Sequence, residues 1–221
     1  MKLLVLSGGN HPYEESTPVL ESFLKQAGHE VTVTEDAAQI NSENLANFEI
    51  LIFNTMRSGD TTLSRAQQTA MTHVIGGGHG FVSLHSSNVR PDDWHGYHDI
   101  TGGGWISADS WHPPYGQFEV NVTNSNHECV VGISDFLTND ELYMGCALKD
   151  GNDYFLHADS EEGTHKWRDK ETFMPGGTFP LGWTRKYGNG KVFVTNLGHN
   201  GLSFKTPEYQ KLVLNGINWV S

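Results

Sequence analysis

The sequence predicts a single α/β domain built on a mainly parallel β-sheet with helices on both faces. Short apolar runs recur through the first half of the chain, and they are too apolar for strands with one wet face. Segments with the apolar spacing of helices alternate with these runs. The length of 221 residues fits one domain, here taken as residues 1–221, and the chain shows no repeat, linker or low-complexity segment.

Strands and helices follow one another in the order β-α-β-β-α-β up to residue 85. The predicted elements are a strand at 3–6, a helix at 14–27, a strand around Val31 and Val33, a strand at 49–55, a helix at 63–75 and a strand at 80–85. Gly28 supplies the stop of the first helix, and Thr62 or Ser64 lies near the start of the second. This order is typical of a parallel sheet covered by helices.

The chain changes character after residue 88. Residues 92–116 are rich in Gly, Trp and His without a clear period, and a loop of this length is usually functional. The remaining predicted elements are strands at 117–123 and 153–159, a hairpin over 181–199 and a closing helix at 207–220. The hairpin turns at Asn189-Gly190, a dipeptide that favours tight β-turns.

The composition of the chain excludes some classes of binding partner. The formal net charge of −12 argues against nucleic acid and anionic membrane, which both require basic patches. No apolar run reaches the roughly 18 residues that a membrane span requires. Two cysteines, Cys129 and Cys146, indicate reduced thiols in a cytoplasmic protein. We therefore expect a small neutral or cationic ligand, and the sequence leaves open whether the chain forms a homo-oligomer.

Histidines follow several of the predicted strands. Ligands of open parallel sheets bind at the carboxyl ends of the strands. His11, Asn54, Arg57, His85 and Ser86 all follow such strands. His199 follows the last strand, and His112 lies in the long loop. We expect these side chains to meet at one edge of the sheet, although a lone histidine at a strand end is more often a structural, hydrogen-bonded residue.

The stretch "GFVSLHSSN" (80–88) carries an apolar strand into a polar turn at His85. An imidazole there could transfer protons near neutral pH. It could instead bind a divalent metal such as zinc together with His11, His112 or His199. No HExxH or CxxC spacing supports the metal, so no cofactor is certain. A structural alternative is that Ser86, Ser87 and Asn88 satisfy a buried His85 by hydrogen bonds.

Several other side chains have two interpretations each. Glu141 in "NDELY" could be a general acid or base or bind a sugar hydroxyl, but it could also lie in a solvated turn or at a helix cap. Arg57 could bind substrate or form a surface ion pair. Trp105, Trp111 and Trp183 could stack on a sugar ring or belong to the core.

Taken together, the motifs resemble those of the ThuA-like, or trehalose-utilisation, family within the class I glutamine amidotransferase-like superfamily. The residues that carry the resemblance are "SGGNHPYEES", "GFVSLHSSN", "GGGW" followed by "WHPPYG", "NDELY", "PLGWTRKYGNGKVFVTNLGHN" and "NGINWV". The resemblance covers nearly the whole chain and implies a flavodoxin-like α/β sandwich with a link to sugar metabolism. In glutamine amidotransferases a nucleophilic cysteine occupies the sharp turn after the strand that corresponds to 80–85. Here that position is His85, so we expect no glutaminase activity.

Two functions from different classes remain after this reasoning. The first is an enzyme, such as a lyase, isomerase or hydrolase, that acts on a disaccharide or a keto-sugar derivative. It would use acid-base chemistry by His85, His112, Glu141 and His199, with or without a metal. The substrate-binding residues would be His11, Asn54, Arg57, Ser86, Trp111 and Trp183. The alternative is a non-catalytic sugar-binding or regulatory module on an amidotransferase-like fold.

Overall fold

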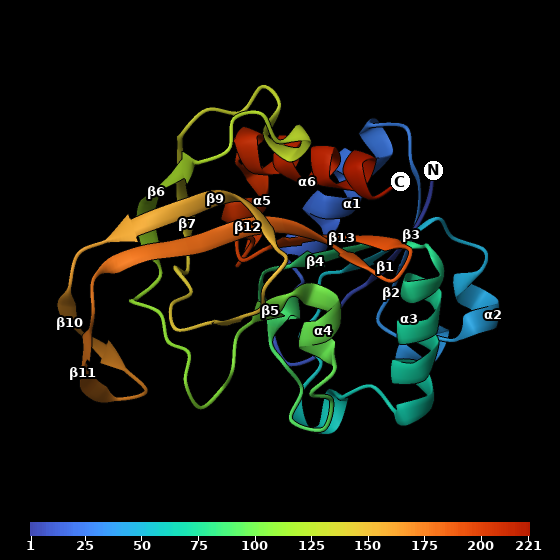
Figure 1. The fold of residues 1–221 in the computed structure, drawn as a ribbon, viewed down its shortest axis with the longest axis horizontal. Coiled ribbons are helices and arrows are strands. Elements are labelled where there is room, and N and C mark those ends of the chain that lie inside the picture. Colours follow the sequence, from blue (N-terminus) through green and yellow to red (C-terminus); the bar gives the residue numbers. More distant parts are fainter.

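A nine-stranded mixed β-sheet forms the centre of the protein (Figure 1). The computed structural model describes residues 1–221. Five neighbouring strands are parallel, in the order β2 (Glu30–Thr34), β1 (Lys2–Leu6), β3 (Ile50–Phe53), β4 (Gly80–Leu84) and β13 (Gly190–Thr195). Four antiparallel strands extend the sheet, in the order β12 (Gly177–Tyr187), β9 (Asp153–Ser160), β6 (Gly116–Val122) and β7 (Phe136–Asp140). The α/β prediction is confirmed, with a sheet that is mixed because the β12–β13 hairpin reverses the chain direction.

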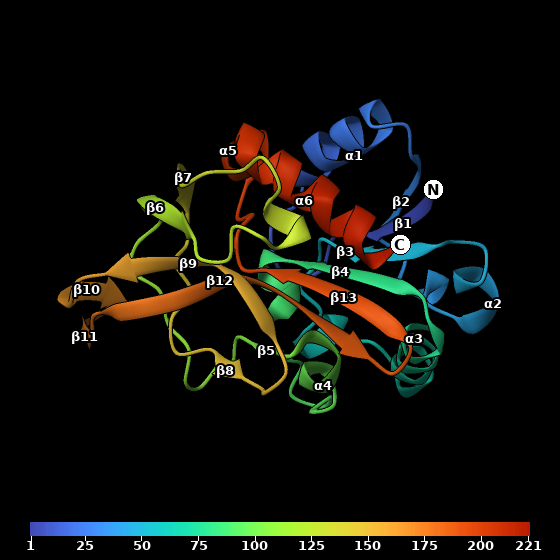
Figure 2. The ribbon, with the colours of Figure 1, turned by 45° about the horizontal axis from the view of Figure 1, so that its top comes forward.

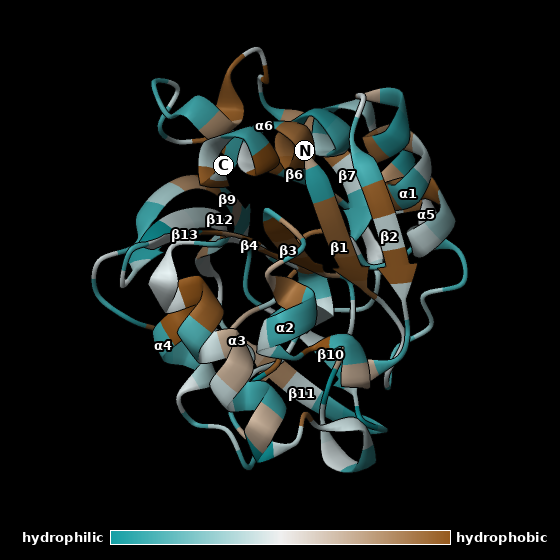
Figure 3. Ribbon diagram, turned by 90° about the vertical axis from the view of Figure 1, so that its right-hand side faces the viewer, coloured by the Kyte–Doolittle hydropathy of each residue, from teal (hydrophilic) through white to brown (hydrophobic).

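Helices cover both faces of the parallel strands (Figures 1 and 2). One face carries α1 (Ser16–Gln26), α5 (Gly201–Lys205) and α6 (Pro207–Val220), and the other carries α2 (Ser42–Leu45), α3 (Arg65–Gly77) and α4 (Tyr97–Thr101). Successive side chains of β1 point to opposite faces, as in any strand. Leu3 and Val5 therefore join the core under α1 and α6, whereas Leu4 and Leu6 join the core under α3. Figure 3 shows β1 largely in the hydrophobic colour, between helices that carry both colours.

Local signals set the ends of the long helices. Ser64 and Gln67 form a reciprocal capping box at the start of α3, and Gly78 follows its last residue with a φ of 130°. Pro207 is the first residue of α6, where its missing N–H costs no helical hydrogen bond. The observed α1 begins two residues later than the predicted helix at 14–27, and α3 lies two residues further along than the predicted 63–75.

Short elements account for most of what the sequence did not predict. Besides β7, α2 and α4, they are β5 (Gly103–Gly104), β8 (Ala147–Leu148) and the hairpin of β10 (Gly163–Trp167) and β11 (Lys170–Met174). Single 3-10 turns lie at Ala37–Gln39, Gly59–Thr61, His85–Asn88 and Glu128–Val130. None of them spans more than five residues, and the strands β7, β10 and β11 lack the apolar run that marks β1, β3 and β4. None of the helices has the length and apolar character that crossing a bilayer requires.

The topology brings the ends of four parallel strands together. Strands β1, β3, β4 and β13 are consecutive neighbours, so the residues that follow them emerge at the same edge. A bridge between Gly9 and Met56 extends the pairing of β1 and β3 beyond the strands. The turn His85–Asn88 follows β4 at this edge, and α4 packs beside it through a hydrogen bond from His98 Nε2 to the Asn88 carbonyl (3.2 Å).

We expect His98 to make stability fall in mild acid. Burial lowers the pKa of His98 from its ordinary 6.5 to about 4, so between these values the unfolded chain binds a proton that the folded chain does not. One such group reduces the free energy of unfolding by up to about 1.4 kcal/mol for each pH unit in that window. His98→Gln keeps an N–H donor, and its unfolding free energy should change less than that of the wild type between about pH 7 and about pH 4.5.

Urea titrations at the two pH values measure this difference. The exposed His73 lies on α3 and provides the matched control, since His73→Gln should behave as the wild type does. An unchanged pH dependence in His98→Gln would show that His98 is not the source of the acid sensitivity.

Candidate functional site

His85 lies at a strained junction between β4 and the turn that follows it. Its φ is 49°, in the left-handed region that side chains other than glycine rarely adopt. Its side chain is only 2% exposed. A bulky residue in this conformation costs on the order of 1 kcal/mol or more, so the surrounding structure must hold it there. We refer to this junction as the His85 elbow.

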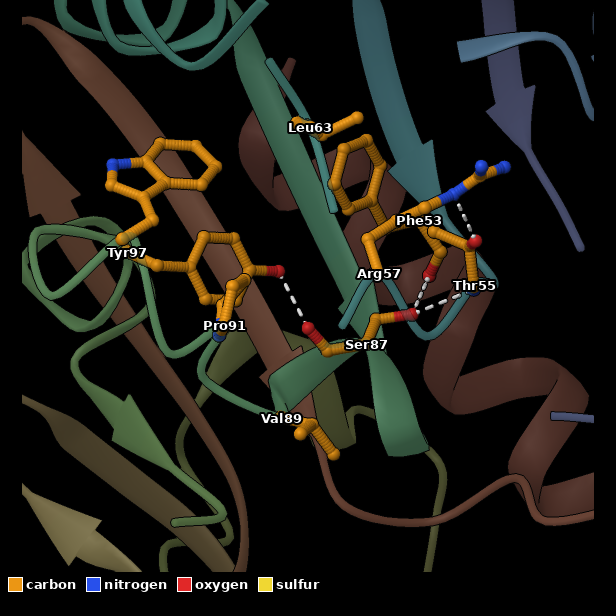
Figure 4. Close-up of a pocket in the computed structure, with 9 residues that line it drawn as sticks. Phe53, Thr55, Arg57, Leu63, Ser87, Val89, Pro91 and Tyr97 are labelled. Carbon is orange, nitrogen blue, oxygen red and sulfur yellow. Dashed lines mark hydrogen bonds between the residues drawn. The ribbon is translucent and has the colours of Figure 1, made fainter. Parts of the chain in front are cut away.

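Polar residues of the turn attach the elbow to both neighbouring strands. Ser87 donates its hydroxyl to the Phe53 carbonyl and accepts the Thr55 N–H, both at 2.9 Å (Figure 4). Asn88 donates its side-chain amide to the Thr195 carbonyl of β13 at 3.0 Å. Tyr97 of α4 donates to the Ser87 carbonyl at 2.6 Å (Figure 4). The small cavity in this figure, about 10 Å³, is room for roughly one water and not for a sugar.

Partners of the His85 ring come from distant segments and not from the turn itself. Nδ1 lies 2.9 Å from the Asn196 carbonyl, which can only accept, so Nδ1 carries the proton and donates it. In the neutral ring Nε2 presents its lone pair and the Tyr143 hydroxyl donates to it at 2.9 Å, whereas in the protonated ring Nε2–H points toward the Glu141 carboxylate. Ser86, Ser87 and Asn88 were the structural alternative for satisfying this ring, but they bind Tyr13, β3 and β13 instead. The elbow thus aims a basic nitrogen away from the sheet.

Two more histidines bring a ring nitrogen to Nε2 of His85. His199 Nδ1 lies 3.3 Å from His85 Nε2 and 3.3 Å from His11 Nε2. The three ligand-capable nitrogens all lie within 4.8 Å of one another. Glu141 Oε2 also lies 3.2 Å from His199 Nδ1, so a single proton on this nitrogen cannot satisfy the carboxylate and both short nitrogen pairs. A further shared proton or a cation between the nitrogens would satisfy them.

Glu141 faces this group of histidines. Its Oε2 lies 3.2 Å from His199 Nδ1 and 3.5 Å from His85 Nε2. Its Oε1 lies 3.5 Å from His112 Nε2, on the other side of the carboxylate. His112 therefore joins the site through Glu141 and lies outside the set of three that could hold a metal. We call His11, His85, His112, His199 and Glu141 the histidine cluster.

A second carboxylate holds the loop after β13 in place. Asp140, the last residue of β7, is 1% exposed and accepts the backbone N–H groups of Gly198 (2.7 Å), His199 (3.1 Å) and Glu141 (2.9 Å). Its Oδ1 lies 3.8 Å from His85 Nδ1. Burial raises the pKa of Asp140, and the neighbouring His85 and the backbone N–H groups offset part of that rise. Asp140 thus positions two members of the histidine cluster, Glu141 and His199.

The members of the histidine cluster differ in the direction of their pKa shifts. Burial, together with His85 and His199, lowers the pKa of His11 to about 4. Burial also lowers the pKa of His112, although Glu141 partly offsets this effect. Burial alone would lower the pKa of His85, but the hydrogen bond to Glu141 and the charge of Asp140 raise it overall. Burial would raise the pKa of Glu141, but hydrogen bonds from His199 and His85 lower it well below its usual range, so Glu141 is a carboxylate at neutral pH.

The remaining predicted site residues lie in the frame around the cluster. Asn54 donates to Ser16 and Thr17 at the start of α1. Arg57 donates to the Ser7 and Glu35 carbonyls and forms no ion pair. Neither side chain joins the cluster. Both side chains hold loops at the strand ends in place, and these loops support the geometry of the histidine cluster.

Ser86, Trp111 and Trp183 also have structural contacts. Ser86 pairs with the Tyr13 hydroxyl at 2.7 Å, and the Tyr13 ring lies 5.1 Å from His11. The Trp111 backbone pairs with Met144, and this bridge holds the backbone just before His112 in place. Trp183 is fully buried in the core under α3 and donates its indole N–H to the Thr101 carbonyl at 2.8 Å. The structure therefore places Trp183 in the core, where its ring faces other side chains.

Sequence reasoning missed several residues of the site. Asp140 and Tyr143 stand on either side of Glu141 in "NDELY", but only the β7 pairing shows that Asp140 faces inward. Only the three-dimensional contact shows that Tyr143, which lies beyond β7, reaches His85. Trp105 and Trp167 pack around His112, at ring distances of 5.7 Å and 4.5 Å. Trp105 is a sequence-predicted candidate for a sugar platform, whereas nothing in the local sequence distinguishes Trp167 from a core residue.

Neither cysteine occupies the elbow. Cys129 is fully buried in the core under α6, and burial raises the pKa of its thiol. Burial also raises the pKa of Cys146 to about 12. Both thiols therefore lack the ionised form that a nucleophile requires.

The comparisons with known proteins agree with this architecture. The family model described as ThuA, trehalose utilisation, matches residues 2–220. A solved structure described as ThuA-like, from Parabacteroides merdae, has a TM-score of 0.77 at 19% identity and covers 99% of this chain and 88% of its own. A similar structure from Bacteroides uniformis has the same TM-score and identity, with 100% and 91% covered.

A structure described as a GMP synthase protein from Thermoplasma acidophilum shares the fold at a TM-score of 0.59 and 14% identity, with 99% of this chain and 92% of that chain covered. No curated protein matches the chain. The structural likenesses support the amidotransferase-like fold, and the family match extends over almost the entire sequence. The chain belongs to the ThuA, or trehalose utilisation, family.

Proposed function

We propose that this protein is an enzyme that acts on a disaccharide or a keto-sugar derivative by histidine and carboxylate acid-base chemistry. The observation that carries the proposal is the meeting of four imidazoles and one carboxylate at the strained His85 elbow. Strained backbone and clustered titratable groups are typical of functional sites. The family's link to trehalose utilisation supports a sugar as the substrate class.

A divalent metal such as zinc is part of the proposal. Metal–nitrogen bonds of about 2.0–2.1 Å at tetrahedral angles place two ligand nitrogens about 3.3–3.4 Å apart. The two His199 pairs, with His11 and with His85, both measure 3.3 Å. The Asn196 carbonyl fixes the His85 tautomer in the way that outer partners of metal-binding histidines commonly do. His11, His85 and His199 would hold the ion, which would supply a Lewis acid to polarise a sugar oxygen.

The other side chains of the cluster would move and position protons. Glu141 is ionised at neutral pH and is the carboxylate nearest the three nitrogens, so it is the proposed general base. His112 faces its other oxygen and is neutral at pH 7, so it can accept a proton from Glu141 or hold a sugar hydroxyl. A keto group on the sugar would acidify the neighbouring C–H bond, which makes proton abstraction by a carboxylate feasible. Elimination or isomerisation could then follow.

Metal binding gives the first prediction for this site. The purified chain should bind one zinc ion per molecule, and His199→Ala should weaken binding by at least about 100-fold, because it removes the central one of three ligands. Binding should also weaken as the pH falls, since the imidazoles must be deprotonated. Isothermal titration calorimetry with zinc alone measures both effects. His73→Ala on the surface of α3 is the control, and equal zinc affinity in the two variants would argue against the site.

Turnover gives the second prediction. His85→Asn should remain folded, since asparagine tolerates the left-handed φ of the elbow, with a melting temperature within a few degrees of the wild type. It should lose about 100-fold or more in turnover, the usual scale for a lost acid-base group or ligand. The assay is proton NMR in D₂O on a panel of disaccharides and keto-sugars, with His73→Asn as the control.

The result also separates an enzyme from a binding module. A folded His85→Asn protein with wild-type turnover would contradict the role of the elbow. Saturable chemical-shift changes in the sugar, without turnover or C–H exchange by the wild type, would show instead a sugar-binding or regulatory module.

A further inference from the structure

The β10–β11 hairpin stands apart from the central sheet. It is a separate two-stranded sheet inserted between β9 and β12, and it extends from the end of these strands (Figures 1 and 2). Its turn consists of Arg168 and Asp169, with φ values of 48° and 63°, and the last pair before the turn is Trp167 with Lys170. Two consecutive left-handed residues make the tight turn of a two-residue hairpin. Trp167 therefore lies at the tip of the hairpin.

The tip reaches back to the histidine cluster. The Trp167 ring lies 4.5 Å from the His112 ring in an edge-on arrangement, and 5.9 Å from the Trp105 ring. Arg168 donates to the Ser107 carbonyl at 3.0 Å, which ties the turn to the loop that carries His112. The side chain of Trp167 is half-buried, and the Arg168 guanidinium lies over its ring at 5.2 Å from the ring centre. A sugar that stacks on Trp167 must therefore use ring surface that Arg168 leaves free or displace the guanidinium.

Aromatic side chains continue from the hairpin tip to the elbow. Trp105 lies 4.7 Å from the Tyr143 ring, and Tyr143 lies 4.6 Å from the His85 ring. Val89, Trp105 and Tyr143 form a small apolar cluster of their own, separate from the two cores, with Trp167 packed against it. An apolar wall thus lines one end of a site whose other members are imidazoles and a carboxylate.

His112, Glu141 and His199 form a row of polar side chains, and a second aromatic side chain packs at the His199 end of this row. Glu141 contacts His112 through Oε1 and His199 through Oε2, so these two histidines lie on different sides of the carboxylate. Trp167 packs on His112, and Tyr115 packs on His199 with a ring distance of 5.2 Å. Tyr115 is 39% exposed, and its hydroxyl donates to the Asn139 carbonyl at 3.1 Å, which holds the ring in place.

We propose that Trp167 and Tyr115 are the stacking platforms of two sugar subsites, one on each side of Glu141. This inference rests on the proposed function and specifies which residues select a two-ring substrate. Aromatic faces bind the apolar C–H face of a pyranose, and the acids and imidazoles between them bind its hydroxyl groups. A disaccharide that spans the two platforms has its glycosidic linkage beside Glu141, where the proton chemistry takes place. A monosaccharide contacts only one platform.

Binding of unmodified sugars tests this assignment without any need for turnover. Isothermal titration calorimetry with trehalose and with glucose should show that the wild type prefers trehalose by about tenfold or more. Trp167→Ala and Tyr115→Ala should each weaken trehalose binding by about tenfold, which brings it towards the affinity for glucose. Tyr115→Phe and Trp167→Phe keep an aromatic ring and should retain most of the affinity for trehalose.

Phe173→Ala is the matched control for the hairpin. Phe173 lies on β11, is 61% exposed and pairs with Thr164 across the hairpin, so its loss should leave trehalose binding unchanged. Circular dichroism checks that each variant is folded. Equal binding of trehalose and glucose by the wild type, or wild-type trehalose affinity in folded Trp167→Ala and Tyr115→Ala, would overturn the assignment. Selective trehalose binding without any turnover would keep the assignment and refute the proposed catalysis.

Discussion

The left-handed backbone of His85 is the constraint on which the site depends. The elbow turns the chain sharply after β4, and it is stable because Ser87 and Asn88 bind the strands on either side. Their hydrogen bonds leave the His85 ring to partners from elsewhere, the Asn196 carbonyl and the Tyr143 hydroxyl. The elbow therefore presents one imidazole nitrogen with a fixed tautomer. The group that the elbow presents to the rest of the site is the His85 imidazole.

The charges around the elbow explain why so many histidines can lie close together. Asp140 fixes the loop of His199 through backbone N–H groups, and Glu141 faces the ring nitrogens directly. Without these carboxylates, a buried imidazole with neighbouring imidazoles would lose its proton readily, as the lowered pKa of His11 illustrates. With them, the pKa of His85 rises. The same ring nitrogens and the Glu141 carboxylate can bind either a proton or a metal cation, because both are positively charged.

Much of the fold could be predicted from the sequence because its signals are local. Apolar runs mark β1, β3 and β4, and α6 has the predicted bounds. The sequence also predicts the β12–β13 hairpin, but its two turn residues are Gly188 and Asn189, one position before the predicted Asn189-Gly190. Strand-end reasoning also singled out His11, His85 and His199, because neighbouring parallel strands end at one edge whatever their loops do.

The rest of the site depends on contacts between distant segments. The inward position of Asp140 follows from the pairing of β7 with β6. Strand β7 (FLTND) exposes its leucine and buries Thr138 and Asp140, so hydropathy does not indicate which of its faces is inward. Trp167 contacts His112 because the tip of the β10–β11 hairpin lies against the loop that carries His112. Trp183 lies in the core because its position on β12 faces α3 and α4, where its indole N–H reaches the Thr101 carbonyl. A tryptophan next to a turn and one in a strand look alike in sequence. Their roles differ through burial, which sequence spacing does not report.

Crystallographic anomalous scattering at the zinc edge tests the central claim most directly. Crystals grown with zinc should show one strong anomalous peak within about 2.0–2.2 Å of a ring nitrogen from each of His11, His85 and His199. Glu141 should lie beside that peak, and no peak should lie at the exposed His73. An absence of anomalous density at the elbow, with the three imidazoles in place and zinc in excess, would contradict the account.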